Sequence, residues 1–275
     1  MTEQYIETPE GKIFLANYPG KKEERVALVI HGWGENSKWY SDVARKLNKL
    51  GWSVVLPDLR GHGRSFGKRG YIRSWEEYTT DLERVLHSAV TGQSKEKVFL
   101  FGQSMGALVI LRYLQQSSKS HSVTGAVLSS LPFHIDLKVG PFQKNMMSWL
   151  NLIYPSLSIK YKLPKDLKKH TGKVISENKK KHYGHRCFTP RWFAEFHKNI
   201  EIAGKTDFPK HIPLLLLHGA KDSMINLEQL KKTVLERGVF EEHILSYENL
   251  GHKIFQEKLN KKVYDDIQNW AEKIQ

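Results

Sequence analysis

The sequence predicts an α/β fold in which a mostly parallel central sheet is flanked by helices. Apolar runs with the length of strands alternate along the chain with segments of helical periodicity. The run at residues 25–31 is apolar almost throughout, as expected for a central strand that is covered on both faces. The motifs that carry polar or glycine residues directly follow such runs, which is where sites form in parallel sheets.

Strands and helices can both be placed from turn signals and from the spacing of apolar residues. The turn signal Thr8-Pro9-Glu10-Gly11 predicts a β-hairpin over residues 4–18. Further strands are expected at residues 25–31, 53–57, 98–101, 125–130, 213–219 and 244–247. Helices are expected at residues 41–50, 74–89, 107–114 and 260–273.

Residues 131–212 interrupt this alternation. Their first part is apolar and aromatic, and nine lysines stand between Lys160 and Lys181 against Asp166 and Glu177. We therefore predict a core formed by residues 1–130 and 213–275, and a mainly helical cap, or lid, inserted at residues 131–212 over the carboxyl edge of the sheet.

Composition limits the cellular setting. The net charge of +14 indicates an anionic partner. Cys187 is the single cysteine, which excludes an intramolecular disulfide. The polar N-terminus does not resemble a signal peptide, and no apolar run approaches the roughly 20 residues that span a bilayer. We expect a cytoplasmic protein, with contact to anionic membrane surfaces through the lysine-rich cap.

Residues 102–106 have the pattern Gly-x-Ser-x-Gly and stand between an expected strand and an expected helix. Strand, motif and helix in this order are typical of a nucleophile elbow. A sharp turn leaves little room beside the serine, so glycines flank it, and the helix N-terminus favours negative charge. Ser104 is therefore the predicted nucleophile.

An acid and a histidine follow in loops after later strands. Asp222 comes after the strand at residues 213–219, and His252 comes after the last strand. His252 is expected to act as general base and then as general acid, and Asp222 to orient it. Four other acids lie at less suitable places in the strand order: Asp58, Glu76, Asp81 and Glu248.

Two backbone N–H groups are expected to form an oxyanion hole. One belongs to Met105, which follows the nucleophile, and the other lies in the loop after the strand at residues 25–31. Within Gly32-Trp33-Gly34 we expect the N–H of Trp33 to donate.

The chain resembles the monoacylglycerol lipase and lysophospholipase branch of the α/β-hydrolases. The order Ser104, Asp222, His252 is that of this superfamily. Asn36, Gln103 and Ala107 depart from the residues that are common in the branch, which leaves the head-group preference open. The resemblance rests on residues 31–37, 58–65, 69–71, 78, 81, 102–106, 218–222 and 251–252.

This resemblance implies cleavage of single-acyl glycerides, lysophospholipids or other simple esters without a cofactor, and several members have an apolar cap that touches membranes. Methionine and aromatic side chains adapt to irregular apolar ligands, so those of the cap are expected to bind an acyl chain. The residues expected to bind substrate are Phe133, Phe142, Met146, Met147, Trp149, Leu152 and Ile225.

Other ligand classes have weaker sequence support. His182, His185 and Cys187 do not form a closed four-ligand set, so we expect no metal and place these histidines at the surface. No nucleic-acid recognition motif is present. The glycine-rich stretch 61–70 does not open directly into a helix, so we interpret it as a structural turn rather than a phosphate site.

The sequence thus predicts a serine ester hydrolase for single-chain lipid esters that works through an acyl-enzyme. Alternatives on the same triad are a short-chain carboxylesterase and an acyltransferase. A ligand-binding protein without activity and a peptide hydrolase also remain open.

Overall fold

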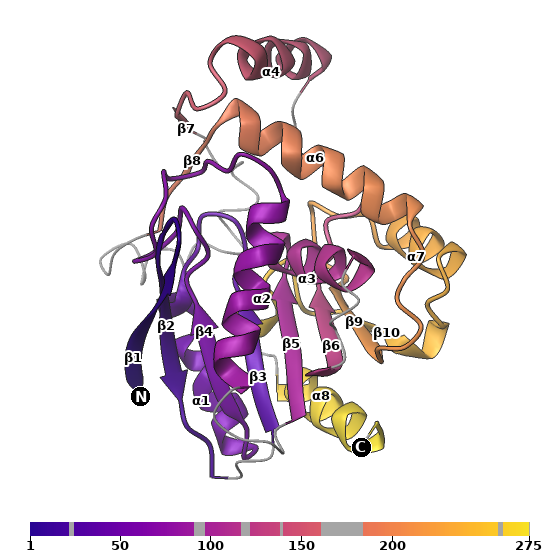
Figure 1. Cartoon of the computed structure of the whole chain (residues 1–275). Helices are drawn as coiled ribbons and strands as arrows, with labels where there is room; N and C mark the ends of the chain where they lie inside the picture. Colours follow the sequence, from indigo (N-terminus) through magenta and orange to yellow (C-terminus); the bar gives the residue numbers. More distant parts are fainter. Residues whose placement is uncertain are drawn as a thin grey trace.

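The core of the computed structural model is an eight-stranded sheet with strand order β1-β2-β4-β3-β5-β6-β9-β10 (Figure 1). The structure describes residues 1–21, 25–90, 97–116, 122–137, 140–160, 184–257 and 261–274. β1 and β2 form an antiparallel hairpin, and β2 also pairs antiparallel with β4. From β4 to β10 all neighbouring strands are parallel. The predicted fold class is confirmed.

The strands of this sheet are short and lie where the apolar runs were found. They are β1 (Thr2–Thr8), β2 (Gly11–Tyr18), β3 (Arg25–Ile30), β4 (Ser53–Pro57), β5 (Lys97–Gln103), β6 (Val123–Ser129), β9 (Leu214–Gly219) and β10 (Ile244–Tyr247).

The central strands are apolar on both faces because helices cover both sides of the sheet. In β5, Val98 and Leu100 belong to one buried cluster, whereas Phe99 and Phe101 belong to the other. This follows from the two-residue period of a strand. The first cluster includes residues of α2 and α3, and the second includes residues of α1 and α8.

The described helices include three α-helices that sequence patterns did not locate, α4, α6 and α7. The α-helices are α1 (Ser41–Lys49), α2 (Glu76–Val90), α3 (Met105–Gln116), α4 (Pro141–Ile153), α6 (Pro190–Lys205), α7 (Leu227–Glu236) and α8 (Lys261–Lys273). The 3-10 helices are η1 (Ser37–Tyr40), η3 (Glu241–His243) and η4 (Ile254–Gln256). Among the described residues, no helix is both long and apolar enough to cross a membrane.

Within the segment predicted as a cap, α6 lies across the carboxyl end of the sheet and α4 lies beyond α6 (Figure 1). α6 begins where Thr189 Oγ1 accepts a hydrogen bond from Trp192 N at 3.3 Å, and Pro190 occupies its first turn. β7 (Ile159–Lys160) and β8 (Cys187–Phe188) form a separate two-stranded ribbon. Most of the lysine-rich stretch, residues 161–183, lies outside the described residues.

Residues 184–189, which lead into α6, pack directly on two glycine-containing loops at the edge of the sheet. His185 N donates to Gly34 O at 3.1 Å, and Thr189 N donates to Gly70 O at 2.9 Å. A Cβ atom on Gly34 would lie 2.5 Å from His185 O, and one on Gly70 would lie 2.3 Å from Cys187 O. Both glycines also have positive φ, so their lack of a side chain allows this close approach.

His185 is not a surface histidine, contrary to the sequence-based expectation. Its ring packs 4.6 Å from that of His62 and 6.0 Å from that of Trp33. Burial lowers the pKa of His185 to about 4 and that of His62 well below its usual value. His182, the other histidine of this group, lies outside the described residues.

We predict that His185 makes the fold less stable as the pH is lowered. A histidine in an unfolded chain titrates near pH 6.5, whereas His185 in the folded chain titrates at about 4. Between these values the unfolded chain takes up a proton that the folded chain does not, so the free energy of unfolding falls as the pH falls through this window. Above the window this group has no effect.

Thermal unfolding of His185→Phe between pH 7 and pH 5 tests this. The melting temperature of the variant should fall less than that of the wild type. Some dependence should remain, because burial also lowers the pKa of His31, His62 and His218. Exposed His87 provides the control, and His87→Phe should follow the wild type. An unchanged slope in His185→Phe would contradict the prediction.

Candidate active site

The turn from β5 into α3 holds Ser104 in a strained backbone conformation. Ser104 has φ = +53°, in the left-handed region that non-glycine residues rarely adopt. Ser104 N donates to Ser129 O of β6 at 2.9 Å, and Ser104 O accepts from Leu108 N at 3.1 Å as α3 begins. The serine is therefore fixed from both sides at the positive end of the helix dipole.

The two glycines of the motif are required by close packing. A Cβ atom on Gly102 would lie 2.5 Å from Ala107 Cα, and one on Gly106 would lie 2.3 Å from Ile30 O. Both neighbours are backbone atoms, which cannot move aside. The elbow thus presses α3 against β5 and β3.

The structure brings Asp222 and His252 into direct contact. Asp222 Oδ2 lies 2.8 Å from His252 Nδ1, and Asp222 Oδ1 accepts from Met224 N at 2.8 Å. Burial alone would raise the pKa of Asp222, but His252 and the Met224 N–H outweigh it, so the pKa lies below its ordinary value. Asp222 is therefore a carboxylate at neutral pH.

The backbone of His252 is held by two residues at the ends of β5 and β6. Gln103 Nε2 donates to His252 O at 2.6 Å, and Ser130 Oγ donates to the same oxygen at 2.8 Å. Ser129 Oγ in turn donates to Gln103 Oε1 at 3.1 Å. Gln103, one of the departures from the family pattern, thus fixes the histidine loop relative to the elbow.

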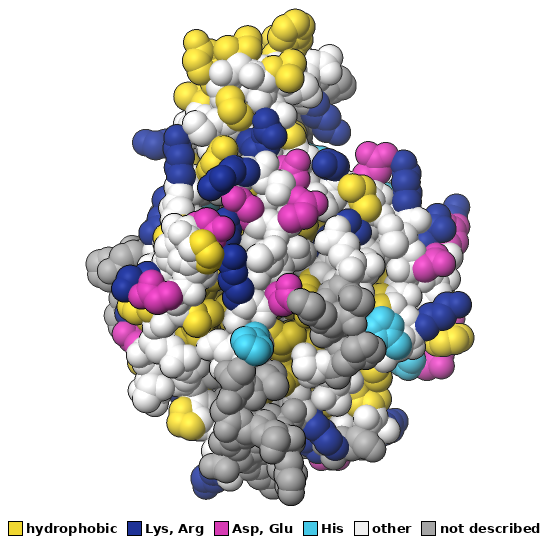
Figure 2. Space-filling view, in the orientation of Figure 1, with side chains coloured by type: hydrophobic (Ala, Val, Ile, Leu, Met, Phe, Trp, Pro, Cys, Tyr) yellow, Lys and Arg dark blue, Asp and Glu magenta, His cyan; other side chains and the backbone are white. Residues whose placement is uncertain are grey.

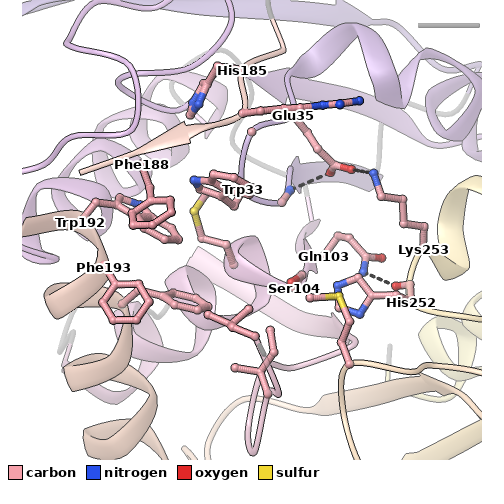
Figure 3. A pocket seen from close by; sticks show the side chains of 18 of the residues that line it. Trp33, Glu35, Gln103, Ser104, His185, Phe188, Trp192, Phe193, His252 and Lys253 are labelled. Atoms are coloured by element: carbon pink, nitrogen blue, oxygen red, sulfur yellow. Dashed lines mark hydrogen bonds and ion pairs between the residues drawn. The ribbon is translucent and has the colours of Figure 1, made fainter. Parts of the chain in front are cut away.

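Ser104, His252, Trp33 and Met105 all line one cavity of about 150 Å³ at the carboxyl edge of the sheet. Figure 3 shows the aromatic side chains of Phe188, Trp192 and Phe193 on one side of it. Ser104 and His252 lie toward the other side, where Glu35 and Lys253 also stand. Met105 is the first residue of α3, and the ring of Trp33 packs 5.7 Å from that of Trp192.

The apolar residues of this cavity differ from those expected from the sequence. Four of the expected residues are exposed on α4 and are not among the residues that line the cavity: Phe142, Met146, Trp149 and Leu152. Ile225 is buried and bridges to Ile135 instead. Besides Trp33, Trp39 and Met105, the apolar lining comes from α6, β8 and two loops: Ile135, Leu137, Phe188, Trp192, Phe193, Phe196 and Met224. Trp192 and Phe196 stand about one helical turn apart in the sequence. This spacing could have indicated an aromatic face on a helix in this segment.

Phe133 and Met147 line a neighbouring groove of about 770 Å³ between α4, α6 and α7. Ile135 and Phe193 line both the groove and the cavity, so these two side chains form the wall between them. The groove also carries charged residues, including Lys144 and Glu201.

Two of the other acids considered from the sequence have structural partners. Asp81 accepts from Arg60 Nε at 2.5 Å in a buried ion pair. Asp58 accepts from Ser37 N at 2.6 Å and from Arg64 N at 2.7 Å, and so closes the turn that contains residues 61–63. Within the described residues, no group of three or more histidine, cysteine or acidic side chains is arranged to hold a metal ion.

Comparison with known proteins identifies the family. A profile of the serine aminopeptidase S33 family matches residues 21–259, which is most of the chain. The chain belongs to this family. It is an α/β-hydrolase of the monoacylglycerol lipase and lysophospholipase branch.

Similar proteins cover nearly the whole chain. Phospholipase YtpA of Bacillus subtilis is 29% identical over 240 residues, covering 87% of this chain and 92% of that protein. A monoacylglycerol lipase of Mycolicibacterium smegmatis is 26% identical and covers 92% of this chain and 89% of its own. The crystal structure of Paleococcus ferrophilus monoacylglycerol lipase superimposes with a TM-score of 0.81 at 26% identity, covering 96% of this chain and 99% of that one.

We predict that Gly102→Ala destabilises this α/β-hydrolase by about 1–3 kcal/mol, the usual cost of forcing extra atoms into a packed site. The new methyl group would collide with the backbone of Ala107. Chemical denaturation would measure the loss. Gly140→Ala is the matched control, because its Cβ atom would meet its nearest neighbour, Gln143 Oε1, only at 3.4 Å. Equal stability of the two variants would contradict the prediction.

Proposed function

We propose that this chain is a serine carboxylic-ester hydrolase that cleaves single-chain lipid esters, such as monoacylglycerols or lysophospholipids, through an acyl-enzyme. The observation that carries the proposal is the Asp222–His252 contact at 2.8 Å, in a cavity that Ser104 also lines from a strained elbow. A serine hydroxyl is a weak nucleophile at neutral pH and needs such a base.

In this mechanism the Oγ atom of Ser104 attacks the ester carbonyl while Nε2 of His252 takes its proton. Asp222 accepts the hydrogen bond from Nδ1–H and stabilises the imidazolium. His252 then protonates the departing alcohol as the bond to the carbonyl carbon breaks. A water molecule, deprotonated by His252, attacks the acyl-enzyme and releases the fatty acid.

The negative charge that forms on the carbonyl oxygen during attack requires hydrogen-bond donors directed at it. We assign this role to the backbone N–H groups of Met105 and Trp33, which border the cavity next to Ser104. Preorganised donors of this kind contribute about a hundredfold to a thousandfold each to the rate. The N-terminus of α3 adds a favourable field.

The two sides of the cavity suit the two halves of such a substrate. The aromatic side, with Phe188, Trp192 and Phe193, provides an apolar surface for an acyl chain (Figure 3). The opposite side, with Glu35 and Lys253, suits a polar leaving alcohol.

The relatives agree with this assignment, since one is named a phospholipase and others monoacylglycerol lipases. A peptidase would need a free carboxylate to hold the amino group of its substrate. Among the described residues that line the cavity, Glu35 has the only carboxylate, and it is paired with Lys253. This favours an ester over an amine-bearing peptide.

We predict that the wild type releases fatty acid from monooleoylglycerol or lysophosphatidylcholine and that Ser104→Ala abolishes the release. Asp222→Asn should retain the fold but lose about 10⁴-fold in kcat, since the amide favours the wrong tautomer of His252. Titration of released fatty acid measures both effects.

The same assay separates the alternatives. Hydrolysis of p-nitrophenyl butyrate without either lipid would indicate a short-chain carboxylesterase, and transfer of the acyl group to an added alcohol would indicate an acyltransferase. If the wild type and Ser104→Ala were equally inactive on every ester, the result would favour a ligand-binding protein without activity.

We also propose that α4 contacts a membrane surface from which the substrate is taken. Large apolar side chains stand exposed along this helix, with Phe142 at 80%, Trp149 at 66% and Leu152 at 77% exposure. Figure 2 shows hydrophobic side chains gathered over α4 at the top of the molecule, with lysine and arginine side chains below them. Such an arrangement suits insertion into the interface of an anionic bilayer.

For the double variant Phe142→Glu/Trp149→Glu we predict at least about tenfold weaker binding to phosphatidylglycerol vesicles, since each buried aromatic side chain contributes about 1.5–3 kcal/mol. Vesicle sedimentation measures the affinity. Phe240→Glu is the control, because Phe240 is as exposed as Trp149 but lies outside α4, directly before η3. Unchanged binding by the double variant would exclude α4 as the contact.

A further inference from the structure

A second buried carboxylate, Glu35, lies beside the proposed active site. It belongs to residues 31–37, which carry part of the family resemblance, but the proposed triad does not use it. Glu35 closes the turn that follows β3. Its Oε2 atom accepts from Gly32 N at 3.0 Å and from Tyr40 Oη at 2.6 Å, and Glu35 N donates to Gly32 O at 3.3 Å. The carboxylate therefore holds the residue that directly precedes Trp33, the expected oxyanion donor.

The partner of this carboxylate comes from the loop of His252, which is far away in the chain. Lys253 Nζ forms an ion pair with Glu35 Oε1, and it lies 4.7 Å from the centre of the Trp39 ring. Lys253 immediately follows His252 in the chain. Its side chain is only 13% exposed, so solvent screens the pair weakly. The dashed lines of Figure 3 run from the loop at Gly32 through Glu35 to Lys253.

The charge of Glu35 matters for catalysis. Burial would raise its pKa, but Lys253 and the Tyr40 hydroxyl outweigh this, so the pKa lies below its usual range and the group is ionised. A buried anion two residues along the chain from an oxyanion donor opposes the negative charge that forms during attack, unless a cation neutralises it.

We propose that Glu35 and Lys253 are positioning residues of the proposed hydrolase: their ion pair ties the oxyanion loop at Gly32 and Trp33 to the loop of His252, and Lys253 cancels the carboxylate charge beside the forming oxyanion. This inference rests on the proposed function. The proposed role differs from a packing role in one measurable respect. The loss of kcat caused by removing the lysine depends on whether Glu35 still carries its charge.

The test is a double-mutant cycle with p-nitrophenyl butyrate, a short soluble ester that removes any contribution from membrane binding. Lys253→Met should lower kcat by about thirtyfold to a hundredfold, close to the loss of one oxyanion donor, with KM changed less than about threefold. Glu35→Gln should lower kcat only about threefold to tenfold, because the amide still accepts from Gly32 N.

The double variant Glu35→Gln/Lys253→Met is the decisive member. It should recover kcat to the level of Glu35→Gln, since no uncompensated charge remains. Lys253→Arg, which keeps the cation, should stay within about threefold of the wild type. Lys262→Met is the matched control, because Lys262 pairs with Asp266 on the surface of α8. Thermal unfolding of each variant verifies the fold.

The outcomes are distinct. A double variant no more active than Lys253→Met, or single variants within twofold of the wild type, would overturn this inference while leaving the hydrolase intact. A wild type that cleaves no ester would overturn the proposed function and this inference with it. If Lys253→Met does not fold, Glu35→Gln decides: its expected threefold to tenfold loss of kcat at constant KM supports the pair, and wild-type kcat contradicts it.

Discussion

Close backbone packing at the turn from β5 to α3 is the constraint on which the rest of the site depends. Gly102 and Gly106 leave no room for a Cβ atom, because Ala107 and the carbonyl of Ile30 occupy that space. Between these two glycines the chain passes Ser104 through a left-handed conformation. The serine is consequently displayed at a helix N-terminus, at the edge where the parallel strands end.

The edge collects further groups because all strands from β4 to β10 run the same way. Loops that are far apart in the chain therefore meet above it. Gln103 after β5 and Ser130 after β6 both bind the carbonyl of His252, which follows β10. The histidine is thus positioned by hydrogen bonds to its backbone as well as by Asp222.

Each buried carboxylate of the site has a partner of its own. Asp222 faces His252, and Glu35 faces Lys253. An unpaired carboxylate would be costly to bury and would oppose an oxyanion. Lys253, which follows His252, links the loop after β3 to the loop after β10 through its ion pair with Glu35, and this link is the basis of the role proposed for it.

Local patterns in the sequence determined the strands, most core helices, the elbow and the order of Ser104, Asp222 and His252. Apolar periodicity and the need for glycine in a tight turn both depend on only a few neighbouring residues. Only the tertiary structure decided which side chains of residues 131–212 line the cavity. Phe142, Trp149 and Leu152 of α4 are exposed, whereas Trp192, Phe193 and Phe196 of α6 line the cavity together with Ser104. Both helices carry apolar residues at similar spacing, so their sequences alone do not distinguish the buried face from the exposed one. The Glu35–Lys253 pair could not be predicted from local patterns either. The two residues stand 218 positions apart and meet only because the sheet brings their loops together.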